Sequence, residues 1–149
     1  TYSGGTTVEA GLVRATGTSS LGSGAVAVTG GKLVLGDGLT FGNSFAVDSN
    51  GVLSGGVGTV INGSLAGVGT LAGALQLGSG AVLQPGSGIG TLGVSGALTL
   101  GAGATWAVDL SASSSDRLSL AAGASLTSNG ATLRPVFADG VGPAGNDAF

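Results

Sequence analysis

The residues of this chain that could do chemistry are few, and the densest group is the run Ser113, Ser114, Ser115, Asp116 and Arg117. A serine beside a carboxylate could act as a nucleophile, but it needs a general base to take its proton. The chain has no histidine and no cysteine, and its one lysine lies far from this run. We therefore expect Asp116 to cap backbone amides in a surface turn and Arg117 to reach a neighbouring strand, and we expect no catalytic residue.

Paired carboxylates are a second form of chemistry, since inverting glycoside hydrolysis needs two carboxyl groups roughly 6.5 to 9.5 Å apart. Asp37 and Asp48 could meet across neighbouring turns of the fold, although solvated acidic corners are the favoured interpretation. The other aspartates fall in separate segments, at positions 109, 116, 139 and 147. The segment Gly36-Asp37-Gly38 is a single imperfect copy of a calcium-binding repeat, which needs stacked copies. We expect no cofactor and no metal, and a polysaccharide-active enzyme is the least supported function.

The composition excludes several classes of partner. Charged residues make up 7% of the 149 residues and the net charge is −3. The four basic residues are scattered, at Arg14, Lys32, Arg117 and Arg134, which argues against binding to nucleic acid and against a polybasic membrane anchor. No run of 18 apolar residues and no signal peptide is present, so direct membrane insertion is not expected. We expect the chain to be an internal piece of an exported protein.

Short apolar couplets two residues apart recur along the chain, each bounded by glycine. This period of two predicts many short strands, and no window suits an amphipathic helix. The expected fold class is therefore all-β. The couplets are Val26/Val28, Leu33/Leu35, Phe45/Val47, Leu75/Leu77, Leu92/Val94, Leu98/Leu100, Val108/Leu110 and Leu118/Leu120.

A longer repeat indicates how the strands are arranged. The segment Leu21–Val26 recurs identically as Leu77–Val82, and related segments align the glycines at 24, 51, 80, 103 and 123, which are 27, 29, 23 and 20 residues apart. Repeats of this length made of short strands predict a parallel β-helix, or β-solenoid, of about six turns. Its corners would require positive φ, which would account for the glycines and for the Asn-Gly pairs at Asn50, Asn62 and Asn129. The rival fold is an antiparallel sandwich with Asn-Gly hairpins.

The run from Ala104 to Ala122 is the longest without glycine, and it holds the only tryptophan, Trp106. Alternation predicts that Trp106, Val108 and Leu110 face the core, while Thr105, Ala107 and Asp109 face outward. The couplet Leu118/Leu120 should also lie inside. The end of a solenoid invites aggregation unless it is capped, and the segment after Ser111, with Pro135 and Pro143, is the expected cap.

Several segments resemble a known family. The segments 1–11, 67–71 and 83–92 resemble the passenger strand repeats of bacterial type V autotransporters, and ALTLGAGATWAVDL followed by SSSDRL resembles the autochaperone region before the translocator barrel. The resemblance implies a right-handed parallel β-helix, with residues 1–95 as passenger repeats and residues 96–149 as autochaperone and capping rungs of the same domain. The residues expected to matter for folding are Trp106, Val108, Leu110, Asp116, Arg117, Leu118 and Leu120.

The resemblance further implies a non-catalytic stem on the bacterial cell surface, attached to the outer membrane through a C-terminal barrel that this chain does not contain. The implied partners are that barrel, the N-terminal rungs of the passenger and a host or bacterial surface. Its C-terminal rungs would promote folding and translocation of the passenger. The alternative function is an adhesin or self-association surface, made by the stacked Thr, Ser and Asn side chains.

Overall fold

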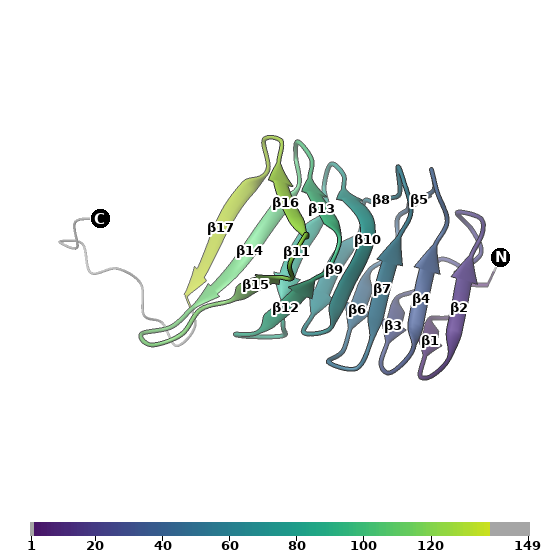
Figure 1. The fold of residues 1–149 in the computed structure, drawn as a ribbon, viewed down its shortest axis with the longest axis horizontal. Coiled ribbons are helices and arrows are strands. Elements are labelled where there is room, and N and C mark those ends of the chain that lie inside the picture. The colour runs from purple at the N-terminus through teal and green to yellow at the C-terminus, as the bar shows by residue number, and fades with distance from the viewer. Residues whose placement is uncertain (1, 138–149) are drawn as a thin grey trace.

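The computed structural model describes residues 2–137, and over these residues the chain winds into a parallel β-helix (Figure 1). The strands form three faces, here called sheets A, B and C, and the chain visits them in the order A, B, C before it returns to A. One such passage is called a rung. Every strand pair is parallel and joins neighbouring rungs, so the predicted parallel β-helix is confirmed and the antiparallel sandwich is wrong.

Sheet A has seven strands in this part of the chain, stacked in sequence order along the rod. They are β1 (Thr6–Val8), β3 (Val26–Val28), β6 (Phe45–Val47), β9 (Ser64–Gly67), β11 (Val82–Pro85), β14 (Thr105–Leu110) and β17 (Thr132–Phe137).

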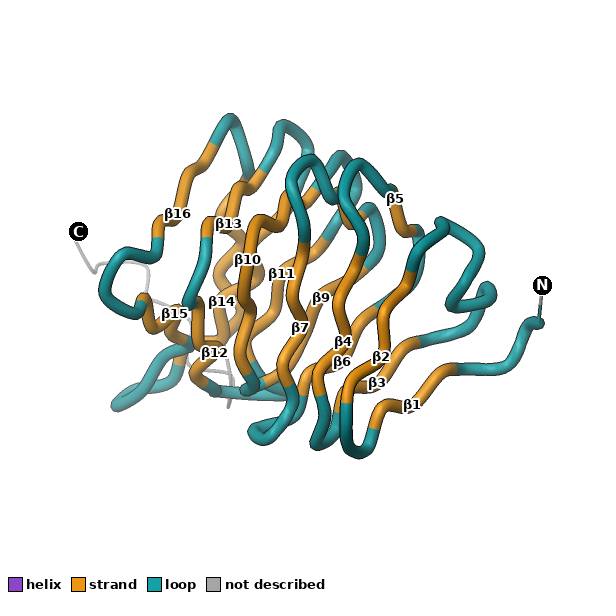
Figure 2. Tube along the Cα trace, turned by 45° about the vertical axis from the view of Figure 1, so that its right-hand side comes forward, coloured by secondary structure: helices purple, strands orange, loops and turns teal. Residues whose placement is uncertain are grey.

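Sheets B and C are joined through one long strand, β10 (Thr70–Leu77), which belongs to B in its first half and to C in its second. The bend in β10 falls at Gly73, whose φ of 66° favours glycine. Sheet B contains β2 (Leu12–Ala15), β4 (Lys32–Leu35), β7 (Val52–Gly55), β10, β12 (Thr91–Val94) and β15 (Arg117–Leu120). Sheet C contains β5 (Thr40–Phe41), β8 (Val60–Ile61), β10, β13 (Ala97–Leu100) and β16 (Ser125–Ser128). Figure 2 shows the loops gathered where the chain passes from one sheet to the next.

The core is a narrow column of side chains that runs along the rod. In sheet A, Phe45, Leu65 and Leu83 occupy successive positions of one register and are each at most 1% exposed. The rings of Phe41 and Phe45 meet edge to face with centroids 6.2 Å apart. Each fully buried aliphatic or aromatic side chain contributes about 1.5 to 3 kcal/mol. The first six predicted couplets are all buried.

The repeat predicted from the glycines does not correspond to the rungs. Gly80 and Gly103 lie at the corner between sheets C and A, whereas Gly51 lies between A and B and Gly123 between B and C. Corresponding core positions in sheet A are instead 18 to 27 residues apart, from Val26 through Phe45, Leu65, Leu83 and Trp106 to Leu133. The strands keep register while the corners absorb the differences in length.

The Asn-Gly pairs also serve a different purpose from the one expected. Only Gly130 of the three glycines has a positive φ, at 83°. A Cβ on Gly63 would lie 2.0 Å from the carbonyl oxygen of Asn43 in the preceding rung, and one on Gly51 would lie 2.1 Å from that of Val28. Glycine is required at these two positions because the rungs approach closely there.

The C-terminal segment continues the rod. Strands β15, β16 and β17 pair in register with β12, β13 and β14. The cap expected after Ser111 is therefore, over the described residues, a continuation of the coil, and Pro143 lies outside the residues that the structure describes. Leu120, Leu133 and Phe137 are 43%, 62% and 41% exposed at this end.

Candidate functional site

The strongest candidate site is the hairpin that carries the run of serines. Strand β14 is longer than β11 beneath it, and the two pair only at Val82 with Thr105 and Leu83 with Trp106. The chain then reverses through an antiparallel bridge between Leu110 and Ser115. The resulting hairpin projects from the corner between sheets A and B (Figure 1).

Pro85 explains why the two strands separate. The amide of Gly86 donates to the carbonyl of Gly67 at 2.7 Å, so residues 84 and 86 direct their amides toward β9, and Pro85 faces β14 instead. Proline has no N–H to donate to the next carbonyl of β14, and the ladder between β11 and β14 ends at this point. The amide of Asp109 lies on the same edge of β14 but beyond the residues that pair with β11. It therefore needs an acceptor outside β11.

The carboxylate of Asp116 is that acceptor. Its Oδ2 accepts from the amide of Asp109 at 2.9 Å, and its Oδ1 accepts from the amide of Gly90 at 2.8 Å. The backbone closes the same contact, since the amide of Asp116 donates to the carbonyl of Asp109 and the amide of Arg117 donates to that of Gly90. Asp116 is 6% exposed. It caps backbone amides as expected, but it is buried, and the expectation of a surface position is wrong.

The serines of the hairpin form the turn itself. The amide of Ser111 donates to the carbonyl of Ser114 at 2.8 Å, and the Oγ of Ser111 accepts from the amide of Ser114 at 3.0 Å. With both oxygens of Asp116 occupied by amides of other segments, the geometry pairs no hairpin serine with a base. The arrangement supports a structural turn rather than a nucleophile.

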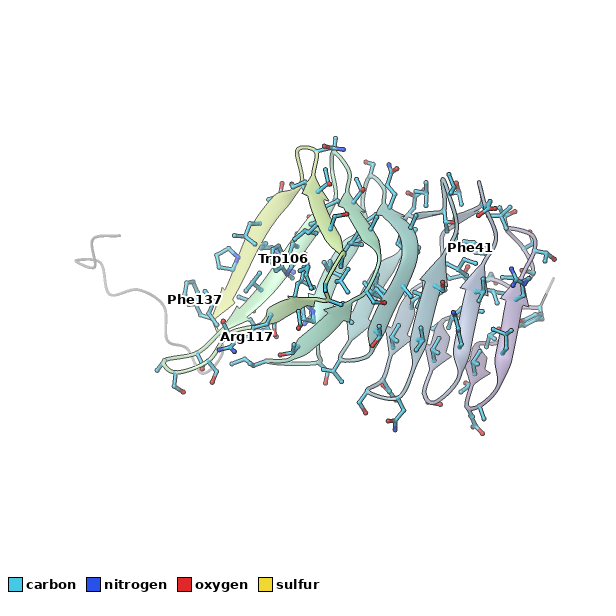
Figure 3. All side chains as sticks on the ribbon, viewed as in Figure 1. Phe41, Trp106, Arg117 and Phe137 are labelled. Carbon is cyan, nitrogen blue, oxygen red and sulfur yellow. The ribbon has the colours of Figure 1, made fainter. Side chains whose placement is uncertain are left out.

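Trp106 lies in the core register between Leu83 and Leu133 and packs against the core cluster near the C-terminal end (Figure 3). Its Nε1 is buried and has no hydrogen-bond partner. Val108 and Leu110, on the same side of β14, are half-buried. They lie beyond the residues at which β14 pairs with β11, so Val108 and Leu110 are not enclosed in the core.

Two side chains that should have faced outward from β14 are buried. Ala107 is 1% exposed and Asp109 is 7% exposed, although the register puts them on the side of β14 opposite Trp106. Ala107 stands beside Arg134, a long side chain that can cover a methyl group. Asp109 lies where the carboxylate of Asp116 joins β14 to the corner at Gly90. The close packing there shields the side chain of Asp109 from solvent.

The residues after the hairpin belong to the last pair of sheet B. Leu118 lies opposite the fully buried Leu92 and packs against the core. Leu120 lies opposite the buried Val94, on the core side of sheet B, but it is 43% exposed on the last described strand of that sheet. Arg117 is exposed at the start of this strand (Figure 3).

The remaining carboxylates do not form a pair. Asp37 lies between β4 and β5 and Asp48 between β6 and β7, which are different corners of the rod, and both are exposed. The Oδ1 of Asp37 accepts from the amide of Val57 in the next rung at 2.8 Å. Asp139 and Asp147 lie outside the described residues. Within residues 2–137 no three His, Cys, Asp or Glu side chains could hold a metal ion together.

Sequence reasoning missed two buried polar residues that join neighbouring rungs. The Nδ2 of Asn43 donates to the carbonyls of Gly22 and Gly24 at 3.1 and 2.8 Å. The Oγ1 of Thr59 donates to the carbonyl of Gly36 at 2.8 Å. Both residues stand at corners next to glycines, but the sequence offers no signal that distinguishes them from the many exposed Asn and Thr residues.

The surface of the rod has a shallow hollow beside Asn43, at the corner between sheets C and A. It is lined by Thr18, Ser19, Gly22, Ser23 and Gly42 together with Asn43. None of these side chains is charged. The hollow supplies no acid, base or nucleophile with a partner.

In the part of the chain that the structure describes, no helix is long and apolar enough to cross a membrane. The comparisons with known proteins gave no match to a family model, to a curated protein or to a solved structure.

Proposed function

We propose that this chain is a non-catalytic stem segment of a secreted autotransporter passenger, and that its C-terminal rungs form the part of the stem that folds first. The observation that carries the proposal is the continuous parallel stacking of sheet A from β1 to β17. The carboxylate with the best geometry for chemistry, Asp116, is committed to two backbone amides. In the proposed stem, both the stacked strands and the carboxylate of Asp116 have a structural role.

A stem must be rigid and long for its mass, and the fold supports both properties. Strands of one sheet are about 4.8 Å apart, so the seven strands of sheet A give a rod roughly 30 Å long. Each rung contacts only its neighbours, which makes the length adjustable through the number of rungs. In this proposal the stem stands at the bacterial cell surface between N-terminal rungs and a translocator barrel.

The strand pairing supports early folding at the C-terminal end. The pair β14 and β17 has six residues in register, whereas no other pair has more than four. Asp116 adds contacts between three segments, because it joins the Gly90 corner, β14 and the start of β15. The only tryptophan also packs here. These contacts join the C-terminal rungs to one another between residues 90 and 137, and the proposal takes them as the part that forms first.

The proposal is tested by following denaturant unfolding of the 149-residue chain with two probes. Fluorescence of Trp106 reports on the C-terminal rungs, and far-UV circular dichroism reports on all rungs. We expect the fluorescence change at a higher denaturant concentration than the circular dichroism change, and protease cleavage to begin N-terminal to Gly96. Fluorescence that changes first, or first cleavage between Gly96 and Phe137, would contradict the proposal.

The secretion part of the proposal needs a longer passenger that contains this segment. Deletion of residues 96–137 is expected to abolish protease resistance of the passenger at the cell surface. Deletion of residues 26–67, a comparable length of N-terminal rungs, is the matched control and should leave the C-terminal remainder resistant. Equal resistance of both deletions would refute a special folding role for the C-terminal rungs.

A further inference from the structure

The hollow at the corner between sheets C and A contains a buried side chain with a free acceptor. The hollow has a volume of about 410 Å³, within the range of small-molecule sites, which is roughly 300 to 1,000 Å³. Asn43 lies in its wall and is 7% exposed. Its Nδ2 donates to the carbonyls of Gly22 and Gly24 in the neighbouring rung. Within residues 2–137 the Oδ1 of Asn43 accepts no hydrogen bond, although it can accept two.

The other wall of the hollow is a loop that the core holds in place. Between β2 and β3 the chain forms no strand of sheet C, and residues 16–25 form this loop instead. The amide of Gly22 donates to the carbonyl of Ser19 at 3.2 Å. Leu21 is 2% exposed and anchors the loop in the core. Because the wall is already ordered, a ligand would not have to order it on binding.

Three hydroxyl groups of this loop line the hollow, those of Thr18, Ser19 and Ser23. Within the described part of the chain none of the three has a hydrogen-bond partner. Ser20 belongs to the same loop but does not line the hollow, and its Oγ donates to a backbone carbonyl of the loop at 2.6 Å. The unpaired hydroxyl groups therefore gather beside the free acceptor of Asn43.

The hollow lies on the side of the rod. Residues 2–5 pack against this corner from the N-terminal direction, where the carbonyl of Tyr2 accepts from the amide of Ser23 at 3.1 Å. A Cβ on Gly22 would lie 2.8 Å from the ring of Tyr2. At Gly42, in contrast, a Cβ would have nothing within 4 Å. The hollow is therefore open beside Gly42, between two successive corners of the rod.

The lining selects a neutral ligand. Among the described residues no charged side chain lines the hollow, so it lacks the usual partners of a phosphate, a carboxylate or a metal ion. It also has no aliphatic or aromatic side chain to hold a lipid tail or an apolar ring.

Sugar hydroxyl groups fit this lining, because each of them both donates and accepts hydrogen bonds. The serine and threonine hydroxyl groups can do the same, and the Oδ1 of Asn43 accepts. We propose that the hollow binds one neutral hexose unit, with a sugar hydroxyl donating to the Oδ1 of Asn43. The unit is either a free sugar or the end of a glycan chain. This binding site does not depend on the stem function, which concerns the stacking of the rungs.

Titration of the ¹⁵N-labelled 149-residue chain with glucose, galactose and mannose tests the proposal. At least one hexose should shift the amide resonances of residues 18–23 and 42–44 in a saturable way, and leave the indole resonance of Trp106 unchanged. We expect a dissociation constant of roughly 1 to 10 mM, because the hollow is open and hydrogen bonds between neutral groups contribute little net free energy. Maltose separates the two sources of the hexose unit. Tighter binding of maltose than of glucose assigns the end of a glycan chain, equal or weaker binding assigns a free sugar, and both results support the site.

Two substitutions test the location of the site. Gly42→Leu places a side chain in the open space beside Gly42 and should weaken binding at least tenfold. Thr18→Val removes a hydroxyl group at nearly constant shape and should weaken binding about three- to tenfold. Ser49→Ala is the matched control, since Ser49 is exposed at a corner between sheets A and B, and it should leave binding unchanged. The thermal unfolding midpoint of each variant verifies that the rod is folded.

Four results would overturn the proposal. The first is the absence of saturable shifts with all three hexoses at 100 mM, a concentration about ten times the weakest expected dissociation constant. The second is a set of shifts that lies outside the two segments. The third is a folded Gly42→Leu variant that binds as tightly as the unchanged chain. The fourth is tighter binding of glucose 6-phosphate than of glucose, which would indicate an anion site instead.

Discussion

Asp116 should be among the most sensitive positions in the chain, although it lies in a run of serines that looks like a surface loop. The variant Asp116→Ala removes an acceptor that the amides of Gly90 and Asp109 reach at 2.8 and 2.9 Å. Hydrogen bonds to a charged group contribute about 1.5 to 3 kcal/mol each. At 6% exposure, little water can replace the carboxylate. We expect a loss of about 3 to 5 kcal/mol in the free energy of unfolding.

This loss would be a large part of the stability of a single domain, which is about 5 to 15 kcal/mol. Asp116→Asn is the finer test, because its amide oxygen can accept one hydrogen bond while its NH₂ group faces the other donor. It should lose about 1 to 3 kcal/mol. Urea unfolding followed by circular dichroism measures both variants, provided that the slope of the transition is unchanged.

Asp37→Ala is the control for the removal of a carboxylate. Asp37 also accepts from a backbone amide, that of Val57 at 2.8 Å, but it is exposed, so water can take its place. Its loss should be at most about 1 kcal/mol. If Asp116→Ala were no more destabilising than Asp37→Ala, the idea that Asp116 replaces the ladder interrupted at Pro85 would be refuted.

Four further substitutions test the packing. Trp106→Phe should change the free energy of unfolding by no more than about 1 kcal/mol, because the indole N–H that it removes has no partner. Trp106→Ala should lower the free energy of unfolding by about 2 to 4 kcal/mol, because it removes the packing of the ring. Urea unfolding measures both variants, and equal losses would contradict this account. Gly63→Ala should lower the midpoint of thermal unfolding sharply, since its Cβ would lie 2.0 Å from a carbonyl oxygen. Gly42→Ala, which has nothing within 4 Å of its Cβ and no positive φ, should leave the midpoint nearly unchanged, and a similar fall in both would argue against the close approach of the rungs.

The fold class could be predicted because its signal is local. Couplets such as Phe45/Val47 and Leu98/Leu100 alternate within one strand, and in these strands the alternation matches which side chains are buried. The rung length could not be read from glycines in the same way. Gly51 and Gly80 look alike in sequence, but one permits close packing and the other has a φ of 83°.

The site could be predicted only in outline. A turn at the serines and amide capping by Asp116 follow from residue type. The burial of Asp116 depends on the separation of β11 and β14 and on the amide of Gly90, which lies 26 positions earlier in the sequence. Likewise, the exposure of Leu120 reflects the position of β15 at the end of the described sheet B rather than its own segment. Both properties come from contacts between rungs, and a pattern within one segment cannot report them.

The parallel stacking has a mechanical consequence. The hydrogen bonds between strands lie roughly along the rod axis, so a tensile force applied between the two ends loads every boundary between rungs in series. The boundary of the first rung is held by two ladders, β1 with β3 and β2 with β4. The next boundary is held by three, since β5 also pairs with β8. A rod pulled from its N-terminal end should yield there first and lengthen in steps of one rung.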